Sequence, residues 1–147
     1  MKRMQHQLLL GALVCGLTYM PVPAMAQAPA ATVWVNGAPP AGATQKELYG
    51  NHLMYIGHRN GNGRVEVHKA QSDILVVQSG EADFLSGGEI QEPVSTGPDE
   101  LQGSSIKGGT KVHVVPGSVI HVAPGVPHQF LMPTGTQFTY LIVKVNK

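Results

Sequence analysis

Two stretches of sequence decide the fold: residues 61–80, GNGRVEVHKAQSDILVVQSG, and residues 117–132, GSVIHVAPGVPHQFLM. Both contain short runs rich in Val and Ile that lie between Gly, Pro and Asn. Residues 65–68, VEVH, alternate strictly between apolar and polar side chains, which is typical of a strand with one buried face. Both stretches therefore indicate β-strands joined by tight turns.

The same pattern continues on both sides of these stretches. Asn60-Gly61-Asn62-Gly63 predicts a hairpin turn, because Asn and Gly tolerate positive φ. Only 13% of residues are charged, whereas the chain has 18 Gly and 11 Pro, a composition that favours many short strands over long solvated helices. We predict an all-β sandwich or barrel with strands at 52–59, 64–68, 74–78, 82–85, 111–115, 119–123, 127–132 and 137–145.

Three segments depart from the strand pattern. Residues 87–110 are polar and rich in Gly, which predicts a long functional loop, with a disordered flap as the alternative. Residues 44–47, TQKE, have the form of a helix capping box and predict one short helix ending at Gly50, with a polar turn as the alternative. Residues 32–35, TVWV, predict one short strand within a tether at 27–50.

The first 26 residues have the pattern of a secretory signal peptide. A basic start at Lys2 and Arg3 precedes the apolar run 8–17, and Ala24-Met25-Ala26 supplies a cleavage signature. The apolar run is about half the ~20 residues that a membrane span needs. We therefore expect export to a bacterial periplasm and no membrane association after cleavage. The only cysteine, Cys15, leaves with this segment, so the mature chain has no disulfide.

Length and charge argue against several independent domains and against nucleic-acid binding. A chain of 147 residues suits one domain, which we place at 51–147. Lys plus Arg is 10 and Asp plus Glu is 9, so no basic excess points to nucleic acid as a partner.

Four polar residues in the strand pattern could carry chemistry. Glu66 and His68 lie two apart and point off the same face of a strand, Asp73 follows after four intervening residues, and His128 comes just after a Pro-Gly turn. If the two hairpins pack together, two imidazoles and two carboxylates converge. Two His and a carboxylate on one side of an ion form a facial site with open positions. A hydrogen-bonded polar cluster that holds no metal is the alternative.

This spacing as a set resembles the cupin superfamily over about 61–132. The first cupin motif matches Glu66-Val67-His68, four residues, Asp73, six residues and Gly80. The second matches Gly117, five residues, Ala123-Pro124-Gly125, two residues and His128. The chain departs from the pattern where Glu66 replaces the leading His, Asp73 replaces Glu, Met132 stands at the usual Asn, and Pro124 is displaced by one. The resemblance implies a single-domain jelly-roll β-barrel.

The resemblance also implies a site and an activity. His68, Asp73 and His128 would bind a divalent metal ion (Fe, Mn or Zn), with Glu66 as a fourth ligand or as the catalytic general base. The implied function is an exported, dioxygenase- or isomerase-like enzyme that acts on a small soluble substrate under the flap 87–110. The alternative is a cupin that binds a small ligand without metal or catalysis. Cupins often dimerise, so a homodimer is expected.

Overall fold

Strands account for nearly all the regular structure of the computed structural model, which describes residues 31–38 and 45–147. The expected signal peptide lies outside the described residues, as does part of the expected tether. Residues Thr32–Lys147 form one unit. In the described part of the chain, no helix is both long and apolar enough to cross a membrane.

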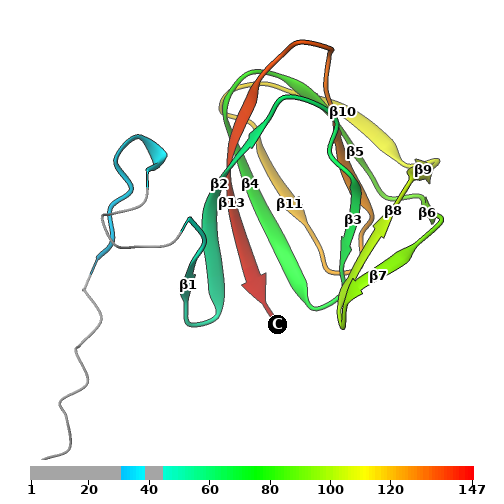
Figure 1. Cartoon of the computed structure of the whole chain (residues 1–147), viewed down its shortest axis with the longest axis horizontal. Coiled ribbons are helices and arrows are strands. Elements are labelled where there is room, and N and C mark those ends of the chain that lie inside the picture. Colours follow the sequence, from blue (N-terminus) through cyan, green and yellow to red (C-terminus); the bar gives the residue numbers. More distant parts are fainter. Residues whose placement is uncertain (1–30, 39–44) are drawn as a thin grey trace, which may run out of the picture. The chain divides into compact units, whose positions relative to one another are not determined.

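Two antiparallel sheets build the domain, as expected for an all-β chain, and they face each other in Figure 1. The five-stranded sheet runs β1 (Glu47–Tyr49), β2 (His52–Arg59), β13 (Phe138–Asn146), β4 (Gln71–Ser79) and β11 (Val119–Val122). The six-stranded sheet runs β10 (Thr110–Val114), β5 (Ala82–Ser86), β12 (His128–Leu131), β3 (Val65–His68), β8 (Glu100–Gly103) and β7 (Val94–Gly97). A separate ribbon pairs β6 (Glu89–Gln91) with β9 (Ser105–Lys107). The eight strands predicted between residues 52 and 145 are all present.

The core lies between the two large sheets and is centred on aromatic rings. Phe130 packs against Phe84, Phe138 and Tyr140 at centroid distances of 5.0, 4.9 and 4.8 Å, with tilted planes. These residues are at most 5% exposed and come from β5, β12 and β13. Burying such large rings supplies much of the apolar area that a small domain without disulfides needs.

Gly57 on β2 makes room for this aromatic core. A Cβ atom at this position would lie 2.8 Å from both Tyr140 Cζ and Ile142 Cδ1. Tyr140 is directly opposite Gly57 in the ladder between β2 and β13, so the phenol ring lies over the glycine. Because Gly57 has no side chain, the Tyr140 ring can lie in the interior against β2.

The segment 87–110 is not the long loop that the sequence predicted. It contains β6, β7, β8 and β9, and β8 pairs with β3 along its whole length. The short, Gly-rich runs carry weak local signals, and their partners lie far away in the chain, so tertiary pairing decides their structure. Because β7 and β8 extend the six-stranded sheet, this part of the segment is sheet and not a free flap.

Part of the segment 87–110 covers the outer face of β3. Val65 is completely buried yet lies outside the core cluster between the sheets. Gly103 is directly opposite Val65, and a Cβ at Gly103 would lie 2.5 Å from Ile90 Cγ1 on β6. Opposed residues share a face of the sheet, so Ile90 stands over the side to which Val65 points.

Both predictions for the N-terminal part of the domain were wrong. Glu47–Tyr49 is strand β1, paired with β2, where the sequence predicted a short helix. Its pairing with β2 outweighs the weak capping pattern, of which Thr44 lies outside the described residues. The predicted strand at 32–35 is absent, and Val35–Gly37 is a 3₁₀ turn, η1, with Asn36 and Gly37 at positive φ.

Candidate metal centre

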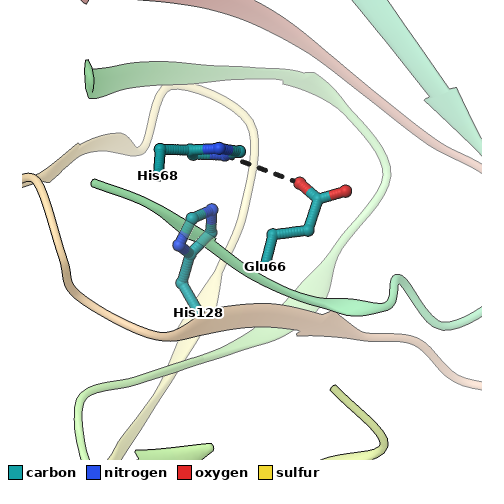
Figure 2. Close-up of side chains that lie close together, drawn as sticks. All are labelled: Glu66, His68 and His128. Atoms are coloured by element: carbon teal, nitrogen blue, oxygen red, sulfur yellow. Dashed lines mark ion pairs between the residues drawn. The ribbon is translucent and has the colours of Figure 1, made fainter. Parts of the chain in front are cut away.

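Glu66, His68 and His128 converge inside the barrel (Figure 2). One ligand atom from each side chain can be chosen so that all three lie within 4.8 Å of one another. Glu66 and His68 come from β3, and His128 is the first residue of β12, directly opposite Glu66. The alternation of β3 points Val65 and Val67 outward, so its two polar side chains face the interior.

A turn brings His128 to this position. Gly125 adopts φ +81°, a conformation that favours glycine, and its N–H donates to the His68 carbonyl at 2.8 Å. The turn before β12 is therefore bonded directly to the end of β3. This contact explains why two sequence motifs about sixty residues apart share one site.

Both imidazoles direct Nε2 toward the interior. His128 Nδ1 lies 3.0 Å from the Val126 carbonyl, which can only accept, so Nδ1 carries the proton and Nε2 keeps its lone pair. His68 Nδ1 contacts the carboxylate of Glu100, and its Nε2 lies 3.7 Å from Glu66 Oε2. An imidazole fixed by an outward Nδ1–H, to a carbonyl or a carboxylate, is the arrangement usual around metal-binding histidines.

Asp73 lies beside the three residues but is engaged elsewhere. It is 3% exposed on β4, and its Oδ2 is 3.4 Å from His68 Nε2 and 3.5 Å from His128 Nε2. Both its oxygens accept from Lys144 Nζ at 3.0 Å. Burial alone would raise the pKa of Asp73, but the adjacent imidazoles of His128 and His68 and the Lys144 charge hold that pKa well below its usual range.

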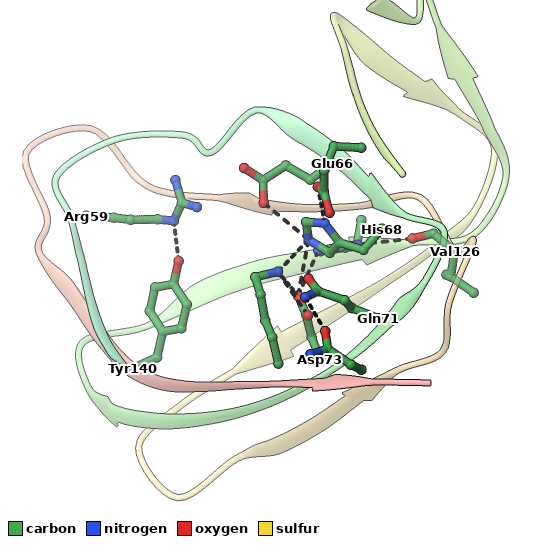
Figure 3. A network of polar contacts seen from close by, with 11 residues as sticks. Arg59, Glu66, His68, Gln71, Asp73, Val126 and Tyr140 are labelled. Carbon is green, nitrogen blue, oxygen red and sulfur yellow. Dashed lines mark hydrogen bonds and ion pairs between the residues drawn. The ribbon is translucent and has the colours of Figure 1, made fainter. Parts of the chain in front are cut away.

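Lys144 supplies the cation at the centre of this network (Figure 3). Its Nζ lies 2.7 Å from His68 Nε2, and the side chain is 11% exposed. Burial and the Lys144 charge lower the pKa of His68, but the nearby carboxylates of Asp73 and Glu100 outweigh them, and the pKa is raised. Lys144 thus places one positive charge against the Asp73 carboxylate and the His68 imidazole.

The four residues singled out in the sequence come together, and two more join them. Glu100 and Lys144 were missed by the sequence analysis. Glu100 lies in the segment taken for a loop, so no pattern pointed to it. Lys144 points to the same inward face of β13 as Tyr140 and Ile142, because alternate residues of a strand share a face. The sequence did contain this signal. His113 and His121 are exposed, and His113 pairs with Asp83 and Glu81.

The cluster forms one end of a cavity of about 250 Å³ between the sheets. Glu66, Asp73, His128 and Lys144 contribute polar atoms, and the rest of the wall includes aromatic side chains and two arginines. Glu66 is the most accessible of the four, since its side chain is 32% exposed. The arrangement combines an ion-binding corner with space for a small molecule.

No protein-family model and no curated protein matches this chain, but solved structures do. An uncharacterised conserved protein with a double-stranded β-helix domain from Klebsiella pneumoniae matches at TM-score 0.53 and 18% identity, covering 81% of this chain and 91% of that one. Hydroquinone 1,2-dioxygenase PnpCD, solved with Cd²⁺ and 4-hydroxybenzonitrile, matches at TM-score 0.53 and 12% identity, covering 79% and 72%.

A sugar phosphate isomerase of the cupin superfamily from Silicibacter pomeroyi matches at TM-score 0.47 and 16% identity, covering 79% of this chain and 59% of that one. Some matched proteins are much longer, and the chain spans as little as 39% of their length. The fold that this chain shares with the Klebsiella pneumoniae protein is a double-stranded β-helix, which is the cupin type of fold.

Proposed function

We propose that this protein is a small cupin that binds a divalent metal ion through Glu66, His68 and His128 and acts on a small soluble molecule. The observation that carries the proposal is the orientation of the two imidazoles. Each fixes its Nδ1–H outward, to Val126 or Glu100, and directs Nε2 toward the same interior point as the Glu66 carboxylate. Such preorganised nitrogen and oxygen donors suit a metal ion better than a solvated polar cluster.

The chemistry of the donor atoms narrows the choice of metal ion. Two imidazoles with one or two carboxylates and no sulfur suit Fe(II), Mn(II) or Zn(II). When bound, the ion would supply Lewis acidity and orient the substrate. In the sequence-based hypothesis Asp73 was a ligand, and in this structure its carboxylate is paired with Lys144. We therefore assign three ligands to the ion and give Asp73 the role of holding Lys144.

Dioxygenase or isomerase chemistry is the activity we propose. The fold is shared with a dioxygenase solved with Cd²⁺, which supports this choice of class. Glu66 is suited to exchange a proton with a substrate hydroxyl, because its side chain is the most exposed of the three proposed ligands and lines the cavity. The buried rings of Phe130 and Tyr140 would exclude water from the reacting end.

A metal-free binding protein is the second candidate, and one observation favours it. Lys144 Nζ already lies within hydrogen-bond distance of both Asp73 and His68. This ammonium could satisfy the cluster without an ion, and the cavity would then bind a small ligand directly.

We also propose export and self-association. The pattern of residues 1–26 supports secretion to a periplasm, and the sequence-based resemblance to cupins supports a homodimer. Mass spectrometry of the secreted protein would detect cleavage before Gln27, and light scattering would give the number of chains per particle.

Metal analysis of the purified protein tests the main proposal. We expect about one Fe, Mn or Zn per chain in the wild type and in the control His113→Ala, whose imidazole is exposed and outside the cavity. The ion should be lost in His128→Ala while circular dichroism shows an intact β fold. A wild-type protein that stays folded and empty after dialysis against each ion would instead support the metal-free binding protein.

A further inference from the structure

We propose that the cavity takes a small organic acid, whose carboxylate is bound by Arg59 and Arg64. The inference rests on the proposed function in one respect. It places the acid in the cavity that contains the proposed metal site, and so specifies the chemical class of the substrate. Figure 3 shows Arg59 and Tyr140 on the side away from His68 and Asp73, and Arg64 also lines the cavity.

Arg59 reaches the interior from β2 with an uncompensated charge. Its Nε donates to the Tyr140 hydroxyl at 2.6 Å, and its guanidinium carbon lies 5.8 Å from the centre of that ring. Among the residues that the structure describes, no carboxylate is within ion-pair distance of Arg59. The phenol fixes the side chain through Nε, and the two terminal nitrogens form the planar pair that matches a carboxylate.

Arg64 adds a second guanidinium at the rim. It lies two residues before Glu66, so the alternation of the chain directs both toward the same side. Its Nη1 donates to the Gln102 side-chain oxygen at 2.8 Å, a neutral partner that leaves the charge uncompensated. As for Arg59, the described part of the chain offers it no ion pair.

The charges around the cavity favour an anionic ligand. Three lining side chains are cationic, Arg59, Arg64 and Lys144, and two are anionic, Glu66 and Asp73. Lys144 is already paired with Asp73, and a metal ion bound at Glu66 would add two further positive charges. A bound carboxylate would offset the excess at the two guanidinium groups.

Tyr140 provides a third polar contact for the same carboxylate. Burial raises the pKa of this phenol despite the opposing charge and hydrogen bond of Arg59, so the hydroxyl keeps its proton at neutral pH. Because its oxygen accepts from Arg59 Nε, its own O–H is left to donate. The aromatic rings of Tyr55, Phe130 and Tyr140 would contact the apolar part of the acid.

Benzoate and benzamide test the inference, because the two probes have nearly the same shape and differ in charge. Calorimetric titrations would be made on the purified protein, with and without added Zn²⁺, at low ionic strength. We expect benzoate to bind at least about tenfold more tightly than benzamide, the difference that one charge-assisted contact provides. Arg59→Gln and Arg64→Gln should each remove most of this preference, while Lys107→Gln, a change of an exposed cation outside the cavity, should leave it intact.

Equal binding of benzoate and benzamide, or no binding of either, would overturn the inference, as would tighter binding of inorganic phosphate than of benzoate. Arg64 is exposed, so its variant remains informative if Arg59→Gln fails to fold. The metal-free titration separates this inference from the proposed function. A preference for benzoate without any Zn²⁺ binding would support the arginine site and contradict the metal centre, and Zn²⁺ binding without the preference would do the reverse.

Discussion

At the scale of single residues, the chemistry of the site depends on which nitrogen of each imidazole faces inward. The Val126 carbonyl fixes His128, and the Glu100 carboxylate fixes His68. Both partners lie outside the set of residues that the cupin-like motifs suggest, yet they decide that two lone pairs meet at one point.

Glu100→Gln should weaken metal binding. A carboxylate that accepts from Nδ1–H makes the imidazole a better ligand, and removing such a partner typically lowers metal affinity by about 10- to 100-fold. Calorimetric titration with Zn²⁺ or Mn²⁺ would measure the change, with Glu89→Gln on β6 as the control. Unchanged affinity in Glu100→Gln would show that the contact with His68 does not tune a metal ligand.

Lys144→Met should strengthen metal binding. The ammonium lies 2.7 Å from the His68 Nε2 atom that the ion would need, so it must move or be repelled when the ion binds. Repulsion between a divalent ion and a nearby charge is worth on the order of a few kcal/mol near a protein surface, so we expect a gain of at least about tenfold. The metal-free variant should also melt at a lower temperature, because Asp73 loses its partner.

If Lys144→Met and the wild type bind the ion equally, Lys144 does not compete for the site. If the variant binds and the wild type does not, the lysine keeps the natural protein metal-free, and the binding protein without metal becomes the better account. The same titration thus separates the two candidate functions.

At the scale of elements, the positions of most strands could be predicted from alternation and turn residues. Which strands pair with one another could not be predicted. The run 52–59 is rich in apolar residues and ends at an Asn-Gly turn, and 137–145 is rich in β-branched and aromatic residues, so each was predicted close to its observed limits. The strands β6 to β9 were not predicted, because their stability comes from partners such as β3 and not from local preference.

The same reasoning explains what the sequence could say about the site. Glu66, His68, Asp73 and His128 were found because the first two share strand parity and the others stand at motif spacings. Glu100 could not be found, since only the pairing of β8 with β3, which puts Glu100 opposite His68, brings it to the site. The engagement of Asp73 by Lys144 likewise depends on β13 lying directly beside β4.

Gly57→Ala should destabilise the domain. The new methyl group would lie 2.8 Å from Tyr140 and Ile142, inside normal contact distance, and overpacking of this kind costs about 1–3 kcal/mol. Urea unfolding followed by fluorescence would measure the loss. Gly61→Ala is the matched control, because a methyl group there has no neighbour within 4 Å. Equal stability of the two variants would mean that the ring of Tyr140 can move away from β2.

At the scale of the whole molecule, the buried charges make stability depend on pH. The depressed pKa of Asp73 means that the folded state binds fewer protons in acid than the unfolded state does. The stabilisation that the ionised Asp73 provides is therefore present above its pKa in the unfolded chain, about 3.9, and is lost as the pH falls below that value. His68 acts in the opposite sense: its raised pKa stabilises the fold below about pH 6.5, and that contribution is lost as the pH rises through the folded pKa.

The free energy of unfolding should therefore fall more steeply between about pH 5 and pH 2.5 in the wild type than in Asp73→Asn. The groups that face this carboxylate, His68, His128 and Lys144, are present in both proteins. Guanidinium chloride unfolding at several pH values would give the two slopes. Parallel slopes would contradict the assignment of Asp73 as an ionised buried partner.

The most direct test of the central claim is anomalous scattering from crystals grown with Mn²⁺ or Zn²⁺, measured on both sides of the metal absorption edge. Our account predicts one anomalous peak inside the barrel, within about 2.0–2.3 Å of Glu66 oxygen and of Nε2 of His68 and His128. Lys144 should then have moved away from His68. No peak at this position, with Lys144 still bonded to Asp73 and His68, would contradict the proposal of a metal centre.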